Sequence, residues 1–297
     1  MSAADRQSPW QNELDDLLRG VAGAFLFGAP FLYTMEVWWK GNFTTPPRML
    51  FALGLTYISL IALNQAAGFR AEEKSTTWIR TLADSAEGLA IGLTTAALSL
   101  VLIGVIGHGD GLDAIMGRIV MEGMPFSIGV GIANNFLQLG EENNSKGDDA
   151  KAGGDRRKHQ WHDHSWYGTL ADAGVTALGA TIIASSISPT DEIPMIASVL
   201  TIPWLLAIVA ASLVISYVIV FEANFGSQQS RVAQPGIFQT PISETAVSYL
   251  ISLAMSLMML WLFQLLRAED PLAQWVSYTV VLGLPATIGG AAGRLAL

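Results

Sequence analysis

The sequence predicts an all-α membrane protein with eight membrane-spanning helices in two parallel four-helix repeats. Apolar residues make up 51% of the chain and charged residues only 14%, against about 25% charged in soluble domains. Several runs of twenty or more residues carry little charge, and about 20 apolar residues cross a bilayer core of roughly 30 Å. The two halves also match each other. Because each half holds an even number of spans, we expect a pseudo-twofold axis along the membrane normal.

The internal match has two offsets and defines the expected domains. At an offset of 156 residues the matched pairs include Trp10–Trp166, Asp16–Asp172, Thr34–Thr190, Glu36–Glu192 and Pro47–Pro203. At an offset of 160 residues they include Asp110–Asp270, Gly123–Gly283, Pro125–Pro285 and Gly129–Gly289. The sequence therefore predicts a first transmembrane repeat over 1–138, a hydrophilic cytoplasmic linker over 139–165 and a second transmembrane repeat over 166–297.

Hydropathy and turn residues place the spans within each repeat. The expected spans are 19–39, 48–67, 83–107, 113–138, 166–187, 192–221, 243–266 and 272–296. Thr44–Pro47 and Ser188–Asp191 read as turns. Arg294 closes the last span and is expected to extend its charged group to the inner interface.

Charge and motif content narrow the function classes. Twelve of the sixteen Lys and Arg residues fall on the side of the membrane that holds the N-terminus of the chain. Positive charge collects on the cytoplasmic side, so we expect both termini in the cytoplasm. The net charge of -9 argues against a nucleic-acid partner, and the lack of cysteine removes disulfides and thiolate metal sites. We find no nucleophile elbow, P-loop or zinc-protease motif, so we expect no enzyme and no cofactor, although scattered carboxylates leave an intramembrane enzyme open.

Each odd-numbered span begins with an aromatic residue, an aliphatic residue and an acid at fixed spacing. The four acids are Asp16, Asp84, Asp172 and Glu244. Acids in the first turn of a helix offset the positive end of its dipole, and this is one interpretation. The other is a ring of four carboxylates around a cytoplasmic vestibule.

Two glycine-proline segments predict interrupted helices at matching places in the two repeats. They are Gly123-Met-Pro125-Phe-Ser-Ile-Gly129 and Gly283-Leu-Pro285-Ala-Thr-Ile-Gly289. A proline in a helix interior removes a hydrogen bond, and paired interruptions are a sequence pointer to a substrate or ion site. Kinks combined with close helix packing are the alternative.

Four further carboxylates lie at membrane depth, where ionisable groups are costly and often functional. Glu36 and Glu192 are repeat mates near the outer ends of their spans. Glu87 lies one turn beyond Asp84, and Glu122 directly precedes a glycine-proline segment. We hypothesise that Glu122 and Glu87 face the bundle axis and bind a cation or carry a proton.

Three histidines in the hydrophilic loop, His159, His162 and His164, have a spacing that suits a transition metal or a pH sensor. The surrounding charge favours an ordinary solvated loop, and we assign no metal.

The chain resembles a family of bacterial integral membrane proteins without assigned function. The resemblance rests on 19–39, on 188–194 and on 281–294, and it implies a bacterial inner-membrane protein but no activity. From the residues we predict a channel or transporter for a small cation or proton. The alternative is a non-transporting scaffold or sensor that acts through its polar loops. The lipid bilayer is the expected partner, and small-residue faces would allow homo-oligomers.

Overall fold

The computed structural model describes residues 9–70, 78–150, 165–223 and 240–295, and all regular secondary structure in them is helical. The first half holds α1 (Pro9–Leu32), α2 (Met35–Gly41), α3 (Pro46–Arg70), α4 (Trp78–Leu102) and α5 (Leu112–Ala150). The second half holds α6 (Ser165–Ile187), α7 (Glu192–Val199), α8 (Ile202–Tyr217), the π-helix η2 (Val218–Glu222), α10 (Pro241–Leu262) and α11 (Leu272–Leu295).

The helices have the length and composition of membrane spans. Six spans qualify as single segments: α3, α4, α5, α8 with η2, α10 and α11. Two further spans qualify only as bent pairs, α1 with α2 and α6 with α7, and each pair turns through 89°. The described part of the chain thus holds six to eight spans, which confirms an all-helical polytopic membrane protein.

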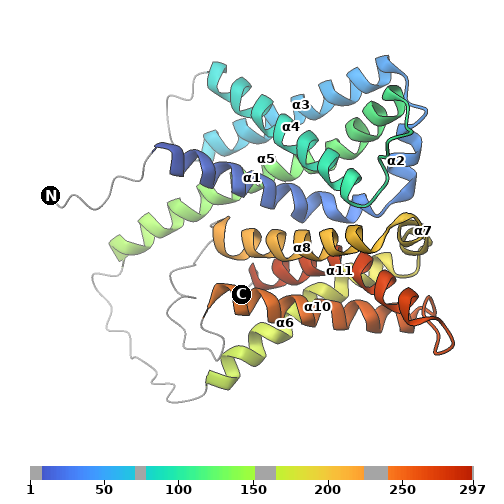
Figure 1. Ribbon diagram of the computed structural model, residues 1–297. Coiled ribbons are helices and arrows are strands. Elements are labelled where there is room, and N and C mark those ends of the chain that lie inside the picture. The colour runs from blue at the N-terminus through green and yellow to red at the C-terminus, as the bar shows by residue number, and fades with distance from the viewer. Residues whose placement is uncertain (1–8, 71–77, 151–164, 224–239, 296–297) are drawn as a thin grey trace.

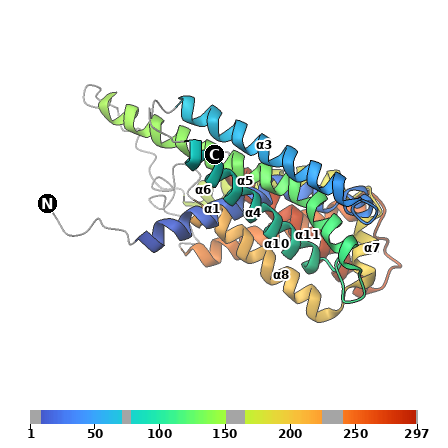
Figure 2. The same ribbon diagram turned by 90° about the horizontal axis from the view of Figure 1, so that it is seen from above.

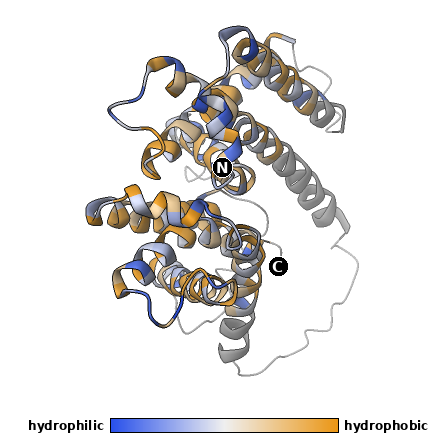
Figure 3. Cartoon of the chain, turned by 90° about the vertical axis from the view of Figure 1, so that its right-hand side faces the viewer, coloured by the Kyte–Doolittle hydropathy of each residue, from blue (hydrophilic) through white to orange (hydrophobic). Residues whose placement is uncertain are grey.

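The two halves lie side by side and run in the same direction. In Figure 1 the first half lies above the second, α1 and α6 begin at the same end, and α2 and α7 lie together at the other. Figure 2 shows the long helices following a common direction. Figure 3 shows hydrophobic residues along the helices of both halves, and many large apolar side chains are exposed, as expected of helices surrounded by lipid.

One central helix organises each half. α5 packs against α1, α2, α3 and α4, and α11 packs against α6, α7, α8 and α10. Glycine allows the closest of these approaches: a Cβ on Gly23 of α1 would lie 2.7 Å from the carbonyl oxygen of Gly129 on α5. The repeat mates Gly179 and Gly289 make the same contact between α6 and α11.

The turns after α4 and α10 are also built alike. Gly104 and Gln264, which are 160 positions apart, both have left-handed backbone angles, with φ of 74° and 63°. In each case the next residue donates its N–H to the carbonyl oxygen of Leu100 or Leu260, both at 2.9 Å. This is the hydrogen bond of a Schellman-type helix end, and it recurs at the predicted offset.

The prediction of one continuous span over 19–39 is wrong. α1 ends at Leu32, and α2 begins at Met35 after the 89° bend. Thr34 is extended, with φ of −112° and ψ of 94°. Its hydroxyl donates to the carbonyl oxygen of Pro30 at 3.2 Å, so the last turn of α1 is satisfied without continuing the helix.

Other predicted boundaries shift as well. The predicted span over 192–221 is divided, because α7 ends at Val199, and Leu200 and Thr201 are extended before Pro203 in the first turn of α8. Proline suits the first turn of a helix. α5 continues to Ala150, past the predicted end at 138 and into the predicted linker, whereas α4 and α10 end at Leu102 and Leu262.

The structure does not show the predicted pseudo-twofold axis, and the contacts between the halves do not follow it. The first half contacts the second through α1 and α4, which pack on α8, η2 and α11. A twofold axis would require equal packing of α6 and α10 on α3 and α5, and no comparable packing occurs within the described ranges. The two halves therefore meet through different faces.

Candidate functional site

The two bends meet at the interface between the halves. At the first bend, the Tyr33 hydroxyl donates to the carbonyl oxygen of Val281 on α11 at 2.8 Å. Next to it, the backbone N–H of Met35 donates to the Glu192 carboxylate at 3.3 Å, and Glu192 directly follows the second bend. The two bent spans thus contact each other, and the first bend also contacts α11, at the interface between the halves.

The bond from Tyr33 has a specific cause. Pro285 has no N–H, so the carbonyl oxygen of Val281, four residues earlier in α11, loses its helical partner. Val281 is fully buried and Tyr33 is only 2% exposed. A freed carbonyl at membrane depth needs another donor, and the Tyr33 hydroxyl supplies it from the other half.

This also corrects the prediction that the glycine-proline segments interrupt their helices. α5 and α11 are continuous through Pro125 and Pro285. Their glycines serve close packing, since Gly123 and Gly283 both face a leucine side chain on the neighbouring helix, while Gly129 and Gly289 face a glycine backbone. The breaks in the structure lie in α1–α2 and α6–α7 instead.

Glu192 and its repeat mate Glu36 have different surroundings. Glu192 is 7% exposed, and one carboxylate oxygen has no hydrogen-bond partner among the described residues. It lies at the N-terminus of α7 and bonds the N-terminus of α2, where the positive ends of helix dipoles favour a carboxylate. Glu36 is exposed.

Glu122 is fully buried, and neither carboxylate oxygen is hydrogen-bonded within the described part of the chain. One turn before it on α5, Arg118 bonds Asn42 just after α2, at 2.5 Å. One turn after it, Phe126 packs where a Cβ on Gly28 of α1 would fall. Glu122 therefore lies at the level of the first bend.

The remaining polar groups at this level are also short of partners. Ser188, in the second bend, is fully buried, and its hydroxyl has no hydrogen-bond partner among the described residues. The indole N–H of Trp38 on α2 is likewise buried without an acceptor there. Arg118, the nearest arginine along α5, bonds Asp110, Asn42 and the carbonyl oxygen of Val105.

Glu87 does not join Glu122. It is exposed on α4, so the hypothesis that both carboxylates face the bundle axis is wrong for Glu87. Exposed Asp84 lies on the same helix, and Glu13 and Asp16 of α1 are close enough to repel the Glu87 carboxylate. These acids lie toward the end opposite the bends.

The four acids of the predicted vestibule have four different environments. Asp16 pairs with Arg19 at 2.6 Å, Asp84 is exposed, and Asp172 is half-buried. Glu244 forms an ion pair with Arg294. Two of the four are thus neutralised by arginine, so they do not act as equivalent members of a ring.

Arg294 is not the interfacial anchor that its position in the sequence predicts. It is 2% exposed, pairs with Glu244, donates to the Ser248 hydroxyl at 3.0 Å and lies 5.7 Å from the centre of the Phe221 ring. A buried guanidinium requires such a set of partners. Arg294 therefore ties α11 to α10 and η2.

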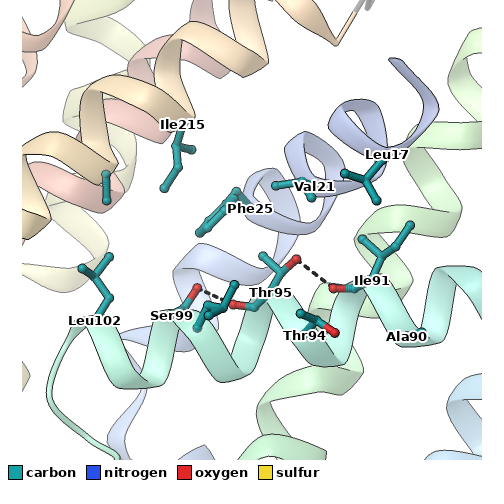
Figure 4. A pocket seen from close by; sticks show the side chains of 12 residues that line it. Leu17, Val21, Phe25, Ala90, Ile91, Thr94, Thr95, Ser99, Leu102 and Ile215 are labelled. Atoms are coloured by element: carbon teal, nitrogen blue, oxygen red, sulfur yellow. Dashed lines mark hydrogen bonds between the residues drawn. The ribbon is translucent and has the colours of Figure 1, made fainter. Parts of the chain in front are cut away.

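A cleft of about 570 Å³ lies between α1, α4 and α8 (Figure 4). Two of its three polar side chains are satisfied within α4: Thr95 donates to the carbonyl oxygen of Ile91 at 2.8 Å and Ser99 to that of Thr95 at 2.7 Å, while Thr94 is exposed. The other walls are mainly apolar, including Phe25 and Ile215. Such a cleft suits an acyl chain and offers no polar path for an ion.

The histidine prediction lies outside the described residues, because His159, His162 and His164 fall within 151–164. In the ranges that the structure covers, no three His, Cys, Asp or Glu side chains are grouped to hold a metal ion.

Bent apolar spans, packed halves and buried acids define a polytopic helical membrane protein. The chain belongs to the family described as "Putative integral membrane protein (DUF2391)", whose family model matches residues 16–297. The family resemblance seen in the sequence is thereby confirmed. Searches of curated proteins and of solved structures found no match.

Proposed function

We propose that the protein carries protons, or a small cation, across the membrane and that Glu122 is the group that binds the ion. The observation that supports this most is the complete burial of the Glu122 carboxylate without a hydrogen-bond donor among the described residues. An isolated charged carboxylate is very costly in an apolar interior. Glu122 is therefore stable there when it holds a proton or a cation.

The depth of Glu122 supports the same proposal. It lies ten residues into α5 from Leu112, which corresponds to about 15 Å along a helix. This is about half of a hydrocarbon core of roughly 30 Å. Transporters commonly bind ions near the midplane, next to discontinuous helices, and Glu122 lies level with the bend between α1 and α2.

We further propose that the chain is a tandem duplication, with repeats over 1–138 and 166–297 joined by the linker 139–165. The matching glycine contacts, the two 89° bends and the matching turns at Gly104 and Gln264 support this. In the orientation proposed here, in a bacterial inner membrane, both termini are cytoplasmic, consistent with the arginine and lysine distribution.

A flux assay in proteoliposomes tests the proposal. We expect the native protein to dissipate an imposed pH or cation gradient, and Glu122→Gln to slow this at least tenfold. Gln keeps the shape and removes the charge, so the variant should fold and be at least as stable as the native protein. Glu269→Gln is the matched control, because Glu269 is exposed in the turn after α10, and its flux should be unchanged. Equal flux in the native protein and Glu122→Gln would reject the role of Glu122.

The apolar cleft favours a second candidate, a non-transporting scaffold or sensor that acts through its polar loops. Its lining of satisfied hydroxyls and apolar side chains is the kind of surface that holds lipid. No flux of protons, Na⁺ or K⁺ by the native protein at any pH tested would support this candidate over transport.

A further inference from the structure

The interface between the two halves uses one face of each. The first half contributes α1 and α4, and the second contributes α8, η2 and α11. Within the duplication proposed above, each half also carries the counterpart of the face that the other half uses. The counterpart of α1 and α4 is α6 and α10, and the counterpart of α8 is α3.

The counterpart of the α1 face is open on α6. Along α1, five positions are buried or half-buried: Leu18, Ala22, Leu26, Pro30 and Tyr33. Their mates 156 positions later are all exposed: Gly174, Leu178, Ile182, Ser186 and Pro189. The difference is large in the middle of the stripe, where Ala22 is 1% exposed and Leu178 is 65% exposed.

The counterpart of the α8 face is open on α3. Ala211 of α8 and Val218 of η2 are half-buried, whereas their mates on α3, Leu55 and Ala62, are exposed. The bends follow the same rule. The backbone N–H of Met35 bonds buried Glu192, while the mates of these two residues, Asp191 and Glu36, are both exposed.

When two repeated units meet through two different faces, the pair keeps one free face of each kind. Further contacts of the same kind can then join such pairs into a closed ring when the geometry allows. We propose that a second copy of this chain packs its α3 face on the α6 face of the first, and that the first does the same to the second. The resulting dimer is a ring of four halves, in which the internal interface recurs between copies.

Cross-linking tests this arrangement directly, because the native chain has no cysteine. Asp191→Cys and Glu36→Cys place thiols at the mates of the bonded pair Met35 and Glu192. Two differently tagged copies, each with one of these substitutions, are co-expressed, and native membranes are treated with a thiol oxidant or a short cross-linker. We expect a covalent dimer of the two tags, and none when either variant is expressed alone.

The double variant Met35→Cys, Glu192→Cys is the positive control, since its cross-link forms within one chain. The backbone nitrogen of Met35 lies 3.3 Å from the Glu192 carboxylate. Failure of the mixed pair to cross-link while this control succeeds would overturn the proposal and leave the open faces to lipid. Cross-linking of either single variant with itself would also overturn it, because it requires like faces to meet. The result does not depend on ion flux.

Discussion

The hydrogen bond between Tyr33 and Val281 yields a quantitative prediction. Tyr33→Phe keeps the ring and removes the hydroxyl that replaces the bond lost to Pro285. Because the Val281 carbonyl is fully buried, leaving it unsatisfied should cost about 1–3 kcal/mol of unfolding free energy. In a Pro285→Ala background, the restored N–H bonds Val281 within α11, so the same substitution should cost close to nothing.

This double-mutant cycle can be measured by unfolding in detergent, following helicity as temperature or denaturant rises. Tyr249→Phe is the matched control, because the Tyr249 hydroxyl is buried without a hydrogen-bond partner among the described residues. Its removal should cost little or should stabilise the protein. An equal cost of Tyr33→Phe with and without Pro285 would refute the explanation, since the two effects would then be independent.

Four further substitutions test features of the fold. Gln264→Gly should raise stability by about 1 kcal/mol, because glycine adopts a left-handed backbone without the steric cost of a side chain; an unchanged melting temperature would contradict this. Gly129→Ala should cost about 1–3 kcal/mol through overpacking against α1, whereas Gly54→Ala, with open space around it, should gain up to about 1 kcal/mol. The backbone N–H of Gly107 and the Arg118 guanidinium lower the pKa of Asp110, so its ionised form stabilises the fold. The stability difference between native protein and Asp110→Asn should be complete above about pH 4 and disappear as pH falls through the lower folded-state pKa.

The sequence predicted the helical spans well but one of the two bends poorly. Ser188 and Pro189 mark the second bend with a turn signal, whereas the proline nearest the first bend, Pro30, lies inside α1 and does not mark its end. The repeat offset of 156 would have transferred the bend from one half to the other. An uninterrupted apolar run by itself predicts a single unbroken helix.

The candidate site was predicted only in part, because sequence patterns do not show packing between distant helices. The burial of Glu122 followed from its apolar neighbours, but Glu87 and Arg294 depend on packing between helices far apart in the chain. Arg294 is buried because Glu244 and Phe221 surround it, and sequence spacing does not reveal this. Tyr33 was missed entirely, although Pro285 signals that the carbonyl four residues earlier needs a donor from elsewhere.

The unequal faces of the two halves have an evolutionary consequence. In an assembly of identical four-helix subunits, every change in the gene alters all subunits together. Under the proposed duplication, a gene that encodes both repeats can change one and keep the other, and Leu282 stands at the position that matches Glu122 of the first repeat. Each polypeptide thereby carries one buried acid at this pair of matched positions. The number of such acids in an assembly is then fixed by the number of chains.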